Sequence, residues 1–170
     1  MLFNIKMNDS KFNKYKSASE ILNKAMKEAI RLCHEKNGLN YVCNFSDNFL
    51  KEETSKIFKK LEKGIMMPTC ISKNKYVSHC NNYEDDKILE GDILRIEMAC
   101  HIDYNVVNLG ETIKVGDENW ESDLYNISKL ALKLGILNIE PDMSIFEYKK
   151  LLEKIAKNYN LNLLKRPNVY

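Results

Sequence analysis

The sequence lacks the marks of a membrane or secreted protein. No apolar run approaches the roughly 18 residues that a membrane span needs. The N-terminal stretch MLFNIKMNDSKFNK has neither a long apolar core nor the small-residue cleavage site of a secretory signal. We therefore expect a cytoplasmic protein with no membrane partner.

Cysteine and glycine patterns exclude further classes. The five cysteines are odd in number and form no Cys-x-x-Cys pair, so neither a disulfide framework nor a zinc cage is expected. The sequence contains no glycine-rich phosphate-binding loop and no G-x-S-x-G turn, so we expect no cofactor. The thiols should be reduced and mostly buried. They are Cys33, Cys43, Cys70, Cys80 and Cys100.

The composition is that of an ordinary globular protein. With 170 residues, 44% of them hydrophobic and 29% charged, the chain is long enough to bury its own core. The net charge of +2 neither requires nor excludes a nucleic-acid partner, so the local distribution of lysines matters more. We expect a flexible basic arm over residues 1–16 and one domain over residues 17–170.

Apolar residues at helical spacing predict two helices in the first part of the chain. Ser17 and Glu20 fit a capping box that would open a helix running to residue 36, where Asn37-Gly38 would stop it. A second helix is predicted over residues 42–63, with Gly64 at its end.

The pattern then changes to strands. Residues 65–72 and 76–79 flank the short turn Lys73-Asn74-Lys75, and residues 93–115 fit a hairpin of two strands, 93–102 and 106–115. Glu84, Asp85 and Asp86 form an acidic group that could bind a cation but is more typical of a solvated loop.

Two more helices are predicted over residues 120–134 and 144–159, the second opened by a Ser144–Glu147 capping box, and residues 161–164 could form a short strand. This order of elements indicates an α+β fold, with an antiparallel sheet covered by helices on one face.

Several short motifs occur in a specific order over residues 14–115. They are Lys-Tyr-Lys-Ser-Ala at 14–18, Met-Pro-Thr-Cys-Ile-Ser at 67–72, Leu-Glu-Gly-Asp at 89–92 and Arg-Ile-Glu-Met-Ala-Cys-His-Ile-Asp at 95–103. This series resembles the pita-bread fold of the methionine aminopeptidase clan. It is still closer to the clan's non-peptidase, ErbB-receptor-binding and proliferation-associated branch. The resemblance implies a C-terminally truncated pita-bread domain.

The resemblance also identifies the positions of a metal site. In the active peptidases an aspartate on one strand and a second aspartate eleven residues later join one histidine and two glutamates to hold two dications. Here the first two positions are Glu97 and Asn108, and the other ligands have no counterpart in this chain. His79 matches the histidine that faces the substrate, although a packed surface histidine is the commoner role. A neutral amide is a weak ligand for a catalytic dication, so we expect a pseudoenzyme with no metal.

The clan's relatives dock on the large ribosomal subunit around the nascent-chain tunnel exit, touching ribosomal RNA and ribosomal proteins. The resemblance therefore implies a ribosome-associated factor, present in the cytoplasm and in some cases the nucleus or nucleolus. Lysines suited to RNA phosphate lie on the second predicted helix and on the turn after it, although solvated helix faces carry similar charges. They are Lys56, Lys59, Lys60, Lys63, Lys73 and Lys75.

Two other functions stay open on the sequence alone. Loss of half a curved sheet would leave an unpaired edge, which a protein-interaction module or a homodimer would cover. A residual metallo-aminopeptidase, completed by another chain, would need tightly bound divalent metal. A Cys80 thiol nucleophile beside His79 is disfavoured, because adjacent strand residues point to opposite faces.

Overall fold

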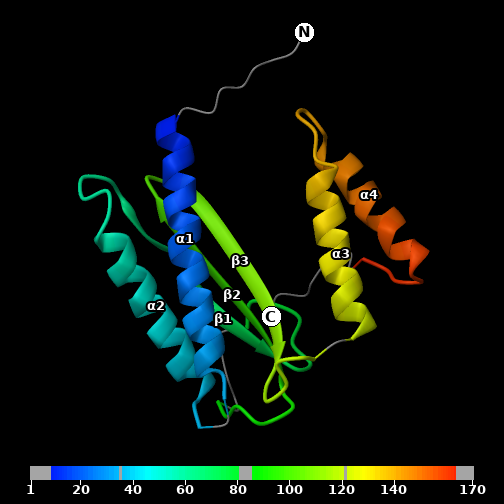
Figure 1. The fold of residues 1–170 in the computed structure, drawn as a ribbon, viewed down its shortest axis with the longest axis horizontal. Helices are drawn as coiled ribbons and strands as arrows, with labels where there is room; N and C mark the ends of the chain where they lie inside the picture. Colours follow the sequence, from blue (N-terminus) through cyan, green and yellow to red (C-terminus); the bar gives the residue numbers. More distant parts are fainter. Residues whose placement is uncertain (1–8, 35, 81–85, 121, 164–170) are drawn as a thin grey trace. The chain divides into compact units, whose positions relative to one another are not determined.

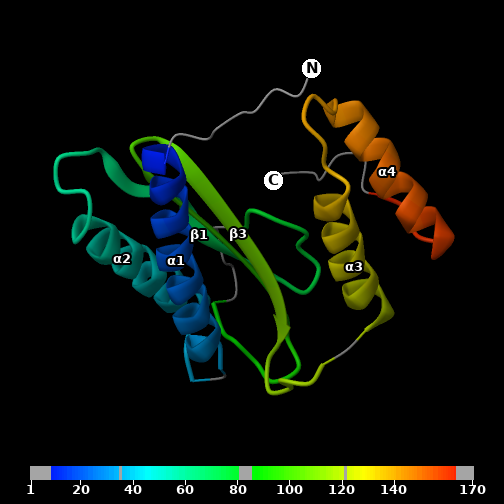
Figure 2. The same cartoon turned by 45° about the horizontal axis from the view of Figure 1, so that its top comes forward.

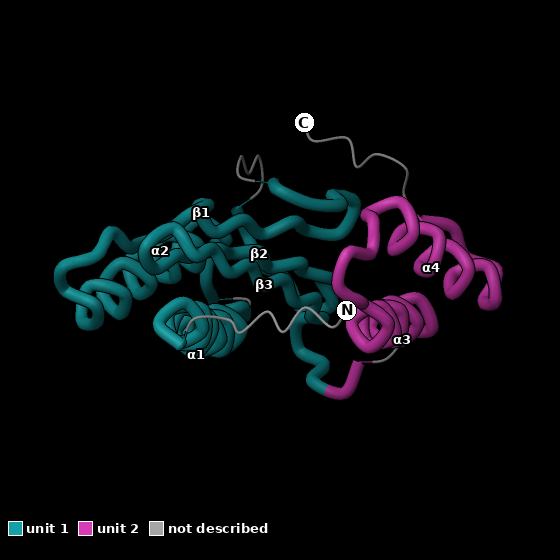
Figure 3. Tube along the Cα trace, turned by 90° about the horizontal axis from the view of Figure 1, so that it is seen from above, with its two compact units in different colours: residues 1–118, 169–170 teal, residues 119–168 magenta. Residues whose placement is uncertain are grey.

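The computed structural model describes residues 9–34, 36–80, 86–120 and 122–163 (Figure 1). The chain divides into two compact units, one up to Glu118 and one beginning at Asn119 (Figure 3). The range 17–170, predicted as one domain, includes parts of both units. None of the described helices is both long and apolar enough to cross a membrane.

Helix α1 (Asp9–Leu32) begins eight residues before the predicted start at Ser17. Residues 9–16, assigned from the sequence to a flexible arm, are therefore helical, and residues 1–8 lie outside the described part. The cause is tertiary, because the Lys14 ammonium pairs with the Asp103 carboxylate at 2.5 Å, in the turn that joins two strands. The proposed Ser17–Glu20 capping box lies inside α1 and does not begin a helix.

Helix α2 (Leu39–Ser55) is shifted toward the N-terminus relative to the prediction. Gly38 adopts an extended conformation at its N-cap and is not a left-handed stop. At its end the backbone bonds tighten to three-residue steps, from the Lys56 amide to the Glu53 carbonyl and from the Ile57 amide to the Thr54 carbonyl. Gly64, expected at the helix end, lies in the first strand.

Three antiparallel strands form the sheet, in the order β1-β2-β3: β1 (Lys63–Lys73), β2 (Ile93–Ile102) and β3 (Asn105–Lys114). The predicted hairpin is confirmed, and its turn residues Asp103 and Tyr104 both have a positive φ, 50° and 58°. Such a turn matches the right-handed twist of the flanking strands.

The predicted strand over residues 76–79 is wrong. Asn74, just after β1, accepts a hydrogen bond from the Ile93 amide through its side chain and donates its own amide to the Ile93 carbonyl. These bonds join the end of β1 to the start of β2. β1 therefore pairs with β2, and the segment from Tyr76 onward does not form a strand beside it.

The core lies between the sheet and the first two helices. Helices α1 and α2 lie side by side over one face, α1 against β2 and β3, and α2 against β1 (Figure 2). Alternate β2 residues point into this layer and are fully buried: Leu94, Ile96, Met98, Cys100 and Ile102. The intervening residues, Arg95 and Glu97 among them, face the opposite side of the sheet.

The second unit is a pair of helices, α3 (Asp123–Leu137) and α4 (Ile145–Asn158). The predicted Ser144–Glu147 capping box is present at the start of α4. Helix α3 starts three residues later than predicted, because the Ser122 hydroxyl caps it by accepting from the Tyr125 amide. Residues 161–163 form no strand, and Leu164 lies outside the described residues.

Candidate functional site

The three positions assigned to a degenerate metal site come together on the sheet face that α1 and α2 leave open. Glu97 pairs with Gly110 across the β2–β3 ladder, and Asn108 pairs with Ala99, so both side chains point to the same face. His79 approaches from the segment after β1. They line a hollow of about 320 Å³.

Glu97 is buried and bound on both oxygens by its own chain. One carboxylate oxygen accepts a hydrogen bond from the Arg95 guanidinium at 3.0 Å. The other accepts from the backbone amide of His79 at 2.8 Å, and the His79 Nδ1 atom lies 3.7 Å from it. His79 reaches this position through a left-handed backbone with φ 54°. The Glu97 side chain is only 8% exposed.

Arg95 is a site residue that the motifs did not single out. It precedes Glu97 by two positions on a strand, and residues two apart share a face, so the alternation of β2 already placed the two side chains together. The guanidinium supplies the positive charge that a buried carboxylate requires.

This donor set does not fit a pair of dications. A two-metal site needs several carboxylates to balance the mutual repulsion of its ions. Here one carboxylate is present, a guanidinium already neutralises it, and Asn108 contributes a neutral amide. Within the described ranges, no three histidine, cysteine, aspartate or glutamate side chains converge as metal ligands would.

Three of the five cysteines are poorly suited to act as nucleophiles. Burial, with the nearby Cys43 as a smaller cause, raises the pKa of Cys33 to about 12, and burial raises that of Cys100 to about 11. Burial and the charge of Glu97 also raise the pKa of the Cys70 thiol. These thiols remain protonated at neutral pH, when attack would require the thiolate.

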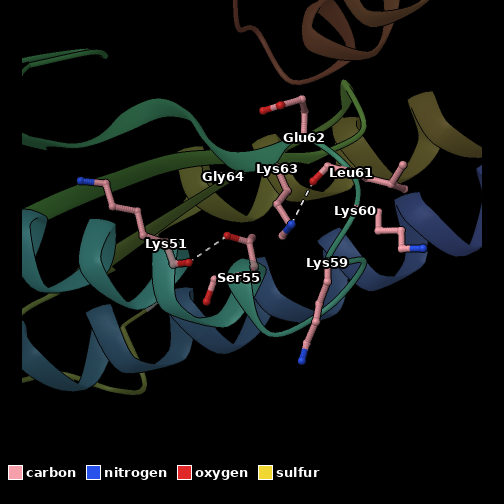
Figure 4. Close-up of a pocket in the computed structure, with 9 residues that line it drawn as sticks. Lys51, Ser55, Lys59, Lys60, Leu61, Glu62, Lys63 and Gly64 are labelled. Carbon is pink, nitrogen blue, oxygen red and sulfur yellow. Dashed lines mark hydrogen bonds between the residues drawn. The ribbon is translucent and has the colours of Figure 1, made fainter.

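A second hollow, of about 390 Å³, lies where α2 ends and β1 begins (Figure 4). Three of the predicted lysines line it, Lys59, Lys60 and Lys63, together with Lys51 from the last turns of α2. Lys51 was not among the predicted residues. The helix was predicted to end eight residues later than it does, so its true last turns were not recognised.

The other predicted lysines are held by local partners. Lys56 bridges Glu52 and Glu53, and its hydrogen bonds to Glu53 and then Glu52 raise its pKa. Lys73 lies at the opposite end of β1, where its half-buried ammonium donates to the Lys87 carbonyl and lies 3.4 Å from Asp92. The Lys75 ammonium lies 5.2 Å from the centre of the Tyr76 ring. The six lysines predicted to bind RNA therefore do not form one continuous surface.

Only Asp86 of the predicted acidic group lies in the described residues. Glu84 and Asp85 lie outside them. Asp86 serves α2 instead, since its carboxylate accepts from the Asn40 amide at 2.6 Å and its carbonyl accepts from the Leu39 amide. It supplies the cap that Gly38 cannot.

Comparison with known proteins identifies the family. Residues 13–168 match the model described as metallopeptidase family M24. The chain belongs to metallopeptidase family M24. It is 31% identical over 160 residues to the ErbB-3 binding protein 1 of Arabidopsis thaliana, with 89% of this chain and 41% of that protein covered. The proliferation-associated protein A of Dictyostelium discoideum is also 31% identical, over 158 residues, which cover 86% of this chain and 41% of that protein.

A solved structure confirms the fold. The structure of a thermophilic Arx1 superposes with a TM-score of 0.74 at 24% identity, covering 92% of this chain and 51% of that one. The M24 chain therefore has the α+β pita-bread fold, as the motifs implied. It spans less than half the length of the two relatives named above.

Proposed function

We propose that this M24 chain is a non-catalytic factor that binds the large ribosomal subunit near the nascent-chain tunnel exit, through ribosomal RNA and ribosomal proteins. The observation that carries the non-catalytic part is the Arg95–Glu97 pair, with the two groups 3.0 Å apart in the hollow where M24 peptidases need metal. A role in subunit maturation or dormancy is compatible with this binding.

Two observations support the ribosomal partner. The relatives named above belong to the ErbB-receptor-binding and proliferation-associated branch, whose resemblance implies ribosome association. In addition, exposed lysines gather at the end of α2 on a polar surface, which suits the phosphates of RNA. We place the factor in the cytoplasm, with the nucleus and nucleolus as further compartments where subunits are assembled.

The test is cosedimentation. Purified protein is mixed with large subunits at low salt and separated on a sucrose gradient. We expect the protein to travel with the subunit and to be released as salt is raised, because phosphate contacts weaken with ionic strength. Protein that stays at the top of the gradient at low salt would overturn the proposal.

One observation favours a second candidate, a homodimer. Among the described strands, β3 pairs only with β2, so its outer edge carries backbone groups that a second copy could bond. Light scattering during size-exclusion chromatography separates the two. A stable dimer that does not sediment with subunits would favour the interaction module.

A further inference from the structure

The hollow at the end of α2 is built from a short, ordered segment. After Ser55 the chain turns through Phe58, which has a φ of 46°, and enters β1 at Lys63. The Lys63 ammonium donates to the carbonyls of Leu61 and Phe58, at 2.9 and 3.2 Å. This lysine therefore holds the turn in place and brings a fixed positive charge to the floor of the hollow.

The surrounding charge is strongly positive. Lys51, Lys59 and Lys60 are exposed, and the described residues offer none of them an acidic partner. Glu62 is the one acid that lines the hollow. The two acids at the end of α2, Glu52 and Glu53, are already engaged by Lys56. Lys56 thus acts from outside the hollow, by neutralising the acids that would otherwise oppose an anion.

The geometry favours a polymer over a single small anion. Lys51, Lys59 and Lys60 point away from one another in Figure 4, so their ammonium groups do not converge on one point. The Thr54 and Ser55 hydroxyls donate to backbone carbonyls and have no proton left for a ligand. Separated point charges without further donors match successive phosphates along a chain and read no base sequence.

The lining also distinguishes RNA from an acidic protein. Leu61 is its one apolar side chain, whereas protein interfaces rely on buried aromatic and apolar anchors and are depleted in lysine. Lysine contacts to phosphate dominate affinity for nucleic acids. We propose that Lys51, Lys59, Lys60 and Lys63 grip the phosphodiester backbone of RNA, an assignment that rests on the proposed function and gives it a specific surface.

The test compares two double variants of the full chain. Lys59→Glu with Lys60→Glu reverses two charges at the hollow, and Lys149→Glu with Lys150→Glu makes the same change in net charge on α4. Binding to a labelled single-stranded ribosomal RNA fragment is measured by fluorescence anisotropy over a range of salt. We expect the hollow variant to bind about tenfold more weakly, with a salt slope reduced by about 1.4, and the α4 variant to change less than about twofold.

Circular dichroism and thermal unfolding establish that both variants are folded, and Lys59→Gln with Lys60→Gln is used if charge reversal unfolds the chain. Equal RNA binding by the hollow variant and the α4 variant would overturn the assignment. Competition by polyaspartate as strong as that by RNA of equal charge would also overturn it, since an acidic protein would then suffice.

The ribosome experiment separates this inference from the proposed function. If wild-type protein sediments with large subunits and the hollow variant does so equally, the lysine surface is wrong while ribosome binding stands. If wild-type protein binds RNA through the hollow but stays at the top of the gradient, the ribosomal proposal fails while the lysine surface stands.

Discussion

At the scale of single residues, the Arg95–Glu97 pair determines what the open sheet face can do. Glu97 is buried, yet both of its oxygens have donors, one from Arg95 and one from the His79 amide. A buried carboxyl group needs hydrogen-bond partners, and Glu97 finds them within its own chain. Arg95 is therefore one of the groups that make the burial of Glu97 tolerable.

Removing Arg95 should expose this dependence. We expect Arg95→Ala to lower the free energy of unfolding by about 1–2 kcal/mol, because the buried Glu97 carboxyl group would lose the hydrogen bond from the guanidinium. The loss is limited by the half-exposed position of Arg95. The double variant with Glu97→Gln should recover most of this loss, since a neutral amide needs no cation. Urea denaturation measures all of these values.

Arg31→Ala is the matched control, since Arg31 pairs with Glu28 on the exposed surface of α1. Its loss should stay below about 0.5 kcal/mol. A loss for Arg95→Ala no larger than this would show that Arg95 does not stabilise Glu97.

At the scale of elements, a remote residue sets the start of α2. Gly38 has an ordinary φ of −95°, so its backbone does not demand glycine. Glycine is required here for steric reasons, because a Cβ at Gly38 would overlap the Asp86 carboxylate that caps the helix. Gly38 and Asp86 therefore act as one unit.

We expect Gly38→Ala to destabilise the protein by about 1–2 kcal/mol, since the methyl group displaces the Asp86 cap. In an Asp86→Ala background the same substitution should cost much less, because the carboxylate atoms that lie nearest to the added methyl group are gone and the cap is already lost. Gly110→Ala is the control, as the nearest atoms to its Cβ lie at 3.8 Å. Additive losses of Gly38→Ala and Asp86→Ala in thermal unfolding would contradict the coupling.

Local patterns predicted those elements whose determinants are local. The Ser144–Glu147 capping box and the hairpin over residues 93–115 were correct, because each depends on residues that are near in sequence. The same serine–glutamate pattern at Ser17 gave a wrong helix start. Lys14 extends α1 toward the N-terminus by pairing with Asp103, which is 89 residues away. Such a contact is invisible in a local window.

The candidate sites divide in the same way. Resemblance to a family identified Glu97, Asn108 and His79 as positions of one site, and strand alternation could have added Arg95. Three lysines of the second hollow were predicted, but the surface they share with Lys51 was not, because it depends on the early end of α2 and on the turn through Phe58. The prediction used helix propensity alone and therefore extended the second helix through that turn.

At the scale of the whole molecule, stability is concentrated in the first unit. The main buried cluster is drawn from residues between Ala18 and Val115, all within that unit. The described part of α3 and α4 contributes three buried residues, Gly135, Ile155 and Ala156. The two units should therefore differ in how often they unfold locally.

Hydrogen exchange followed by mass spectrometry measures this difference. We expect β2 to exchange most slowly, because it is the central strand and its alternate side chains fill the core, whereas α3 and α4 should exchange faster by at least about tenfold. The same peptides measured in the urea-unfolded chain supply the reference rates. Protection of α3 equal to that of β2 would contradict this division of stability.

The guanidinium beside Glu97 also limits which ions this face of the sheet can accept. Because this cation is covalently part of the polypeptide, it stays beside the carboxyl group at any concentration of free metal. A dication entering the hollow would have to displace the Arg95 side chain from Glu97, and the displaced guanidinium would then repel it.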